Sequence, residues 1–184
     1  MPMLLAVTGG PGAGKTTLLD CLRGKGFSVM PECGRALIHD RLAIGAPHPH
    51  ADPVLAGELA LSWELRSYRE AMALPGPVFF DQPLPGLLGH YPRVGLPTPA
   101  HVVTAVDRYR FHPIAFIAPP WPEIYRTDAE RKQTLDEAVE VYERMRDCYE
   151  RTGYELRELP RVPVAQRVEF VLDVINIRAP ATSR

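Results

Sequence analysis

A glycine-rich run near the amino end of the chain constrains its fold more than any other segment. Residues 9–16 read GGPGAGKT and fit the pattern G-x-x-x-x-G-K-[ST]. An apolar run, Met3 to Val7, comes before it, and a predicted helix, Thr16 to Arg23, follows it. The glycines let successive backbone N–H groups point at a polyphosphate, beside the positive end of the helix. This context predicts a strand, a loop and a helix that together bind a nucleoside triphosphate.

Two residues of this loop have specific roles in phosphoryl transfer. Lys15 can reach the β- and γ-phosphates, and the Thr16 hydroxyl can ligate Mg²⁺. The alternative, a glycine-rich turn that holds no ligand, leaves the agreement between the motif and its strand-and-helix context unexplained. The loop residues predicted to contact the nucleotide are Gly10, Gly12, Ala13, Gly14, Lys15, Thr16 and Thr17.

The charge balance favours a small substrate over a polymer. The 184 residues, predicted to form one nucleotide-binding domain over 1–184, carry 21 basic and 22 acidic side chains and a net charge of −1. A domain whose main role is to hold nucleic acid is usually more basic. We therefore expect a small-molecule partner and no nucleic acid. The sequence contains no signal for an oligomeric state.

The cysteines and the apolar runs of the sequence indicate in which cellular compartment the protein is expected. Cys21, Cys33 and Cys148 are widely spaced and odd in number, which suggests neither a disulfide framework nor a zinc site. No apolar run approaches the roughly 18 residues of a membrane span, and no signal peptide precedes the first strand. We expect a cytoplasmic protein without a membrane partner.

Five apolar runs alternate with helical stretches, which is typical of a doubly wound α/β sheet. The predicted strands are Met3–Val7, Phe27–Met30, Val78–Phe80, Ile114–Ala118 and Tyr154–Leu159. The further predicted helices are Pro53–Ala73, Asp128–Thr152 and Val164–Ile175. For the helix from Asp128, Thr127 and Glu130 predict a capping box and Gly153 the exit. Its predicted apolar face is Leu135, Val139, Tyr142, Met145 and Tyr149. The proline-rich stretch 74–99 predicts loops and a short helix on the substrate side.

Residues that directly follow the strands are the candidates for a site, because ligands collect at the carboxyl ends of parallel strands. Asp81, after the third strand, is predicted to hold Mg²⁺ or to accept a proton from an acceptor hydroxyl. Glu32, after the second strand, and Arg35, one turn later, are predicted to bind the substrate or, for Glu32, to deprotonate it. Arg66, on the helix that begins at Pro53, completes the predicted substrate-binding set.

Cations follow the fourth strand at a loop-to-helix boundary. We expect Arg126 and Arg131 to belong to a lid that closes over the phosphates and supplies positive charge during transfer. Arg126 is also expected to contact the nucleotide. Lys132 is better explained as part of an ordinary charged helix face. Val162 and Pro163, after the last strand, are candidates for contact with the base, and core packing is the alternative.

Taken together, these segments resemble a family of small bacterial P-loop proteins labelled AAA-type ATPase domains, related to the ribosylnicotinamide kinase domain. The resemblance is carried by GGPGAGKTTLL, PE-x-x-R at 31–35, FFD at 79–81, APPWPEIYRTDAERKQ and GYELRELPRVPVAQRVEFVL. It implies a kinase-like three-layer sandwich with a five-stranded parallel sheet in the order 2-3-1-4-5 and a helical lid. The resemblance also implies that the nucleotide is ATP. By position, Lys15 would bind the phosphates and Thr16 would bind Mg²⁺. Asp81 would be the acidic residue of the third strand, and Arg126 with Arg131 would form the lid.

The chain departs from the family pattern at position 82. Relatives commonly have Asp-Arg-Gly after the third strand, whereas this chain has Asp81-Gln82-Pro83. The missing arginine removes a cation that could steady an acceptor or a phosphate. Either the substrate differs from that of relatives, or the catalytic burden has moved to Glu32 and Arg35, or transfer activity is weak or lost.

The motifs together predict an ATP- and Mg²⁺-dependent phosphotransferase that moves the γ-phosphoryl group to a hydroxyl of a small metabolite. Nucleosides, sugars, amino acids and natural products are all candidate acceptors. Asp81 is the preferred base and Glu32 the alternative. The alternative function is a nucleotide-dependent regulatory ATPase that acts on a protein partner. The predicted catalytic residues are Lys15, Asp81, Glu32, Arg126 and Arg131.

Overall fold

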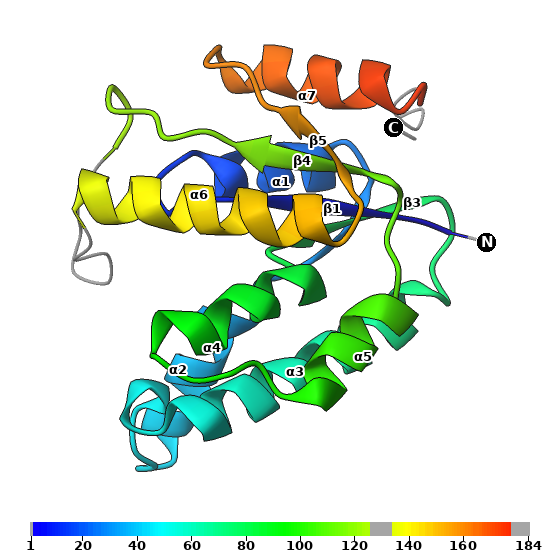
Figure 1. Cartoon of the computed structure of the whole chain (residues 1–184). Coiled ribbons are helices and arrows are strands. Elements are labelled where there is room, and N and C mark those ends of the chain that lie inside the picture. Colours follow the sequence, from blue (N-terminus) through cyan, green and yellow to red (C-terminus); the bar gives the residue numbers. More distant parts are fainter. Residues whose placement is uncertain (1, 126–133, 178–184) are drawn as a thin grey trace.

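A computed structural model describes residues 2–125 and 134–177 of the chain, and its centre is a five-stranded parallel sheet (Figure 1). The strands lie in the order β2-β3-β1-β4-β5, and every neighbouring pair is parallel. This confirms the predicted α/β class and the predicted strand order. The strands are β1 (Met3–Gly9), β2 (Ser28–Met30), β3 (Pro77–Asp81), β4 (Ile114–Ala118) and β5 (Glu155–Glu158).

The helices connect these strands. The predicted helices that begin near Thr16 and at Pro53 and Val164 are present, with ends within two residues of the prediction. Short helices occupy the proline-rich stretch after β3, also as predicted. No helix of the described residues is long and apolar enough to cross a membrane. The bounds are α1 (Lys15–Gly24), α2 (Cys33–Ala43), η1 (Pro49–Ala51), α3 (Pro53–Ala71), η2 (Leu84–Gly89), α4 (His90–Arg93), α5 (Ala100–Arg108), α6 (Leu135–Arg151) and α7 (Val164–Val174).

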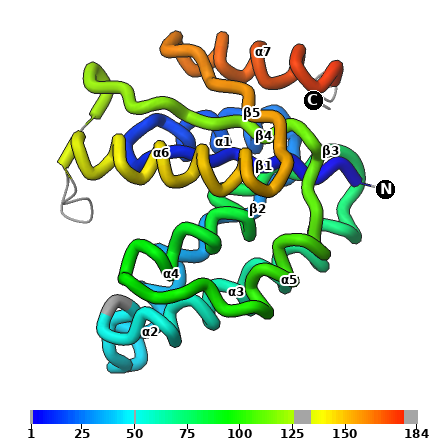
Figure 2. The backbone as a smooth tube through the Cα atoms, viewed as in Figure 1, coloured from blue at the N-terminus to red at the C-terminus, as the bar shows by residue number. Residues whose placement is uncertain are grey.

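Helices cover both faces of the sheet because its central strand is apolar on both sides. Leu5 and Val7 of β1 pack in one core with side chains of α1 and α7. Leu4 and Ala6 pack in the other core with side chains of α3, α5 and α6. Side chains that alternate between two buried faces are expected of a parallel sheet covered on both sides. The predicted three layers are therefore confirmed, and Figure 2 shows the layer of α2 to α5 on the side of the sheet away from α7.

Helix α6 begins later than predicted. Thr134 is its N-cap: the Thr134 hydroxyl accepts a hydrogen bond from the Glu137 N–H, and the Glu137 carboxylate accepts one from the Thr134 N–H. Two T-x-x-E sequences, at 127–130 and 134–137, lie near the start of this helix in the sequence, and the described capping box forms at the second. The described helix therefore begins at Leu135 and not at Asp128, while Thr127 and Glu130, the predicted capping box, lie outside the described residues.

The buried face of α6 also differs in part from the prediction. Val139 is 38% exposed, whereas Ala138 beside it is buried, because the helix presents the stripe that includes Ala138 and Cys148 to the sheet. Tyr142, Met145 and Tyr149 are buried as predicted. Gly153 follows the helix with a φ of 79°, which confirms the predicted exit residue.

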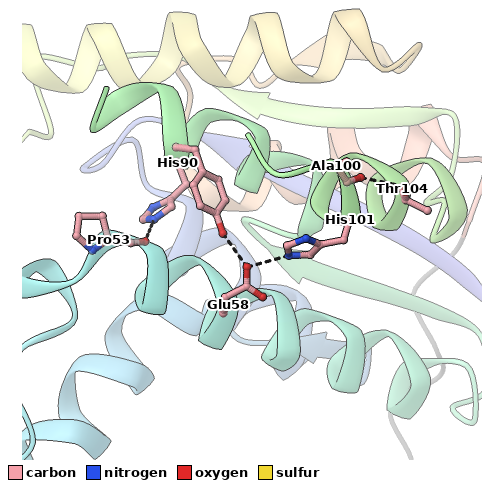
Figure 3. Close-up of polar contacts among 7 residues, drawn as sticks. Pro53, Glu58, His90, Ala100, His101 and Thr104 are labelled. Atoms are coloured by element: carbon pink, nitrogen blue, oxygen red, sulfur yellow. Dashed lines mark hydrogen bonds and ion pairs between the residues drawn. The ribbon is translucent and has the colours of Figure 1, made fainter. Parts of the chain in front are cut away.

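A polar cluster fastens α3 to α4 and α5 within its layer (Figure 3). The Glu58 carboxylate of α3 is 2.8 Å from His101 Nε2 of α5, and it accepts a hydrogen bond of 3.3 Å from the Tyr91 hydroxyl of α4. Gly57 permits this approach, since a Cβ there would lie 2.3 Å from the Tyr91 hydroxyl oxygen. These contacts fix the position of α3, and with it the side chains that α3 directs toward the site.

Candidate functional site

The phosphate loop joins β1 to α1 and requires glycine at several positions. Gly9, Gly12 and Gly14 have φ values of 127°, 74° and 76°, a region that other residues rarely adopt. A Cβ on Gly9 would lie 2.3 Å from the Ala118 carbonyl oxygen of β4, so this glycine is also required by packing. Gly14 is the N-cap of α1. The loop therefore places its backbone at a helix N-terminus, where anions are bound favourably.

Lys15 is folded back on this loop. Its ammonium donates hydrogen bonds to the carbonyl oxygens of Gly10 at 2.8 Å and Gly9 at 3.1 Å, and the residue is 9% exposed. A buried cation needs such partners, because loss of its hydration is otherwise costly. Lys15 also lines the cavity beside the loop, so the ammonium can exchange these carbonyls for a phosphate oxygen.

A cavity of about 710 Å³ opens beside the phosphate loop, a size typical of small-ligand sites. Its walls include the phosphate loop after β1, the carboxyl end of β3, the start of α2 and the start of α7. The structure thus brings together most of the predicted site residues at the edge of the sheet where they were expected. Those that line the cavity are Gly12, Ala13, Gly14, Lys15, Thr16, Thr17, Glu32, Arg35, Asp81, Val162 and Pro163.

Asp81 ends β3 and lines this cavity, and one of its carboxylate oxygens has no partner among the described residues. The residue is 8% exposed, and its Oδ1 has no hydrogen-bond partner among the described residues. Burial raises the pKa of its carboxyl to about 6, while the Lys15 ammonium acts in the opposite direction. Buried polar atoms are normally satisfied, so this oxygen fits a ligand that supplies a cation or a hydroxyl proton.

The donors at this position suit Mg²⁺. Asp81 and the hydroxyl of Thr16 line the same cavity and offer hard oxygen ligands. No group of three or more acidic, histidine or cysteine side chains in residues 2–125 and 134–177 could hold a metal by itself. Mg²⁺ in phosphoryl-transfer sites is usually held by one or two protein oxygens together with water and phosphates.

Glu32 and Arg35 belong to the same site. Glu32 is the N-cap of α2 and has an extended backbone, with φ −60° and ψ 133°. Its negative charge raises the pKa of Asp81 and the positive charge of Arg35 lowers it, so the three side chains lie within electrostatic reach. Two carboxylates and one guanidinium can together orient a hydroxyl-bearing molecule and accept its proton.

Two predicted residues, Arg66 and Gly10, do not line the cavity among the residues that the structure describes. Arg66 lies on the outer face of α3, where its Nε donates to Glu70 at 2.7 Å, because the helix turns Ser67 inward. The structure therefore removes Arg66 from the predicted substrate-binding set. Gly10 packs beneath the loop, with Ala138 of α6 as its neighbour. Arg126 and Arg131 lie outside the described residues, so the helical lid stays a prediction.

The segment after β4 contacts the phosphate loop directly. A Cβ on Gly12 would lie 2.5 Å from the ring of Tyr125, and a Cβ on Gly14 would lie 3.3 Å from Ile124. The Tyr125 hydroxyl donates to the Thr134 carbonyl oxygen at 3.1 Å. This hydrogen bond joins the two ends of the segment that contains the predicted lid.

Arg167 of α7, which the sequence patterns do not predict as a site residue, holds the phosphate loop in place through hydrogen bonds. Its guanidinium donates to the carbonyl oxygens of Ala13 at 3.1 Å and Gly14 at 3.5 Å, and the residue is 3% exposed. The guanidinium carbon lies 5.6 Å from the centre of a Trp121 ring, a cation–π contact. Arg167 and Trp121 both line the cavity on which Val162 also lies. In a sequence, an arginine within an amphipathic helix cannot be distinguished from a surface residue.

Glu64 of α3 is also not predicted by the sequence patterns. It is 3% exposed, and burial raises the pKa of its carboxyl to about 8, although a hydrogen bond with the Cys33 thiol acts in the opposite direction. The negative charges of Glu32 and Asp81 raise this pKa further. Glu64 is therefore mainly protonated at neutral pH, and it lies between the two segments that carry the candidate bases.

Gln82 occupies the position where the missing arginine was noted, and it is bonded to the phosphate loop. Its φ is 52°, and its N–H donates to the Val7 carbonyl oxygen at 2.9 Å. The Thr8 hydroxyl donates to its Oε1, and its Nε2 donates to the Gly9 carbonyl oxygen at 3.0 Å. A neutral side chain with defined partners therefore takes the place of the expected cation.

Comparisons with known proteins agree with this geometry. A family model described as an AAA domain matches residues 4–167. A NadR protein in complex with NR superposes with a TM-score of 0.73 at 14% identity, covering 100% of this chain and 54% of that chain, so this chain spans about half its length. No curated protein matches the sequence.

Two further solved structures cover nearly the whole of both chains. Thymidylate kinase from Ehrlichia chaffeensis has a TM-score of 0.58 at 14% identity, covering 96% of this chain and 100% of that chain. Shikimate kinase from Aquifex aeolicus has a TM-score of 0.56 at 12% identity, covering 95% and 96%. At these identities the likeness establishes the fold, which is that of P-loop kinases.

Proposed function

Because this chain belongs to the AAA domain family and has the fold of P-loop kinases, we propose that it transfers the γ-phosphoryl group of ATP to a hydroxyl of a small metabolite. The observation that carries the proposal is a buried acid, Asp81, that lines the same cavity as the phosphate loop and has a carboxylate oxygen, Oδ1, without a hydrogen-bond partner among the described residues. A phosphate loop serves switches as well as kinases. A buried acid beside it adds a group that can bind and deprotonate an acceptor.

In the proposed reaction the loop N–H groups and Lys15 bind the polyphosphate. Thr16 would hold Mg²⁺, which would supply positive charge beside the β- and γ-phosphates. If Asp81 also ligated the metal, its carboxylate could not serve as the base, and Glu32 would take that role. The acceptor hydroxyl gives its proton to Asp81, its oxygen bonds to the γ-phosphorus, and the bond from that phosphorus to ADP breaks. A pKa of about 6 supports this role, since it leaves Asp81 ionised at neutral pH yet more basic than an ordinary aspartate. Glu32 is the alternative base.

The base of ATP is proposed to lie at the other end of the cavity. Trp121, Val162 and Pro163 offer apolar surface there, and Arg167 lies behind the indole. Stacking on an aromatic ring and packing on apolar side chains suit a flat heterocycle. The acceptor is proposed to lie near Glu32, Arg35 and Asp81, and it is a nucleoside, a sugar, an amino acid or a natural product.

The proposal is tested by incubating the protein with Mg²⁺ and γ-labelled ATP against a fractionated metabolite extract. We expect label on a small molecule with the wild-type protein, none with Lys15→Ala, and unchanged labelling with Arg66→Ala, because Arg66 lies outside the cavity. Label that appears only as slowly released inorganic phosphate, whichever fraction is added, would favour the regulatory ATPase.

A further inference from the structure

The Gly9 carbonyl oxygen is shared by two donors. Lys15 Nζ lies 3.1 Å from it and Gln82 Nε2 lies 3.0 Å from it. A carbonyl oxygen has two lone pairs and can accept from both donors at once. Gly9 is buried, so few other donors can replace either of them.

This sharing matters when Lys15 moves. In the proposed function, Lys15 leaves the loop carbonyls to bind a polyphosphate, and a buried carbonyl that loses its partner raises the free energy of the bound state. Gln82 keeps the Gly9 carbonyl satisfied after Lys15 has left. We propose that Gln82 is a positioning residue for nucleotide binding, which holds the Gly9 carbonyl and thereby releases Lys15 to the phosphates.

The backbone of Gln82 supports a dedicated role. A φ of 52° is uncommon for a residue other than glycine, and such conformations persist only where surrounding contacts determine them. Here three hydrogen bonds do so: the Gln82 N–H to Val7, the Thr8 hydroxyl to Oε1, and Nε2 to Gly9. The conformation directs the carboxamide along the end of β1, where it meets the phosphate loop.

The two ends of the carboxamide can be tested separately. Thr8 is fully buried, so Thr8→Val removes the bond to Oε1 and the contact of the Thr8 hydroxyl with Tyr149 but leaves the Nε2 bond to Gly9. Gln82→Met keeps the length of the side chain and removes both carboxamide bonds. Gln82→Gly removes the carboxamide at a position whose φ suits glycine, so the fold is expected to tolerate it. Gln82→Glu retains an acceptor for Thr8 but cannot donate to Gly9.

The experiment is calorimetric titration of each full-length variant with Mg²⁺ and a non-hydrolysable ATP analogue, together with its melting temperature without nucleotide. We expect Gln82→Met and Gln82→Gly to bind about 2- to 10-fold more weakly than wild type, as expected for one hydrogen bond. Gln82→Glu is expected to bind more weakly still, because it also places a negative charge on the cavity wall beside Asp81. Thr8→Val is expected to bind like wild type, although it lowers the melting temperature.

The outcomes separate this inference from the proposed function on which it rests. Wild-type affinity in Gln82→Met and Gln82→Gly would overturn the inference alone. An equal loss of affinity in Thr8→Val would overturn it too, because the effect would then be general loosening of the loop. If the wild-type protein and Lys15→Ala bind the analogue equally, the assignment of the phosphate site itself is wrong, and the inference with it.

Discussion

Replacing Glu64 by glutamine should remove a large part of the dependence of stability on pH. The Glu64 carboxyl has an ordinary pKa of 4.5, and in the folded protein burial raises it to about 8. Each pH unit between these values corresponds to about 1.36 kcal/mol, so the full effect is about 5 kcal/mol. Folded domains are stable by only about 5–15 kcal/mol, so this one group is a large fraction of the total.

The sign follows from proton binding. Between pH 4.5 and about 8 the folded state keeps the proton on Glu64 while the unfolded state has lost it. The folded state therefore binds more protons, and the free energy of unfolding falls as the pH rises through this window. The contribution of Glu64 is present in full below pH 4.5 and is lost by about pH 8. Glutamine has nearly the same shape and no proton to lose.

The assay is urea unfolding of the wild-type protein and of Glu64→Gln at pH 5 and pH 8.5. Over this interval we expect the wild-type protein to lose about 4 kcal/mol more than the variant. The control is Glu70→Gln, since Glu70 is a surface residue of the same helix and pairs with Arg66. Parallel pH dependences of wild type and Glu64→Gln would refute the argument that the carboxyl is held neutral by burial.

Three further perturbations have defined outcomes. Asp81→Asn should keep nucleotide affinity but lower transfer about 10²- to 10⁴-fold in the labelled-ATP assay, and full activity would shift the base to Glu32. Gly9→Ala should abolish the rise in melting temperature on nucleotide addition, because its Cβ would lie 2.3 Å from a β4 carbonyl oxygen. The control is Gly24→Ala, whose Cβ would have no atom within 4 Å. A normal rise in Gly9→Ala would contradict the geometry. Leu5→Ala, at a position with 0% exposure, should cost about 2–5 kcal/mol in urea unfolding, and a cost near zero would show that β1 is not the centre of the core.

Local patterns were sufficient to predict the strands, whereas the order of the strands was implied by the family resemblance. The strands β1, β3 and β4 are short apolar runs because both of their faces are covered, so composition alone marks them. Helix α5 was not predicted. Its nine residues carry buried Val102, Ala105 and Val106 on one face, but a helix this short is stabilised by packing against the rest of the fold more than by its own propensity.

The residues of the candidate site likewise fall into some that the sequence predicts and others that it does not. The phosphate loop, Glu32 and Asp81 were predicted because each belongs to a strand end that a local pattern reveals. Arg167 and Gln82 act through hydrogen bonds to loop atoms 154 and 73 positions away in the chain, so no nearby residue signals their role. Arg66 was misplaced because the direction of a helix face depends on packing, which the spacing of apolar residues in α3 left ambiguous.

The position of β1 at the centre of the sheet has a consequence for synthesis on the ribosome. Its two neighbours come much later in the chain: Met3 pairs with Pro77, and Val7 pairs with Phe116. At about 5–20 residues per second, translation leaves this strand without a partner for several seconds. The nascent chain therefore exposes an apolar strand until β3 and then β4 emerge, and a ribosome that stalls before β3 would leave that strand open to chaperones or to aggregation.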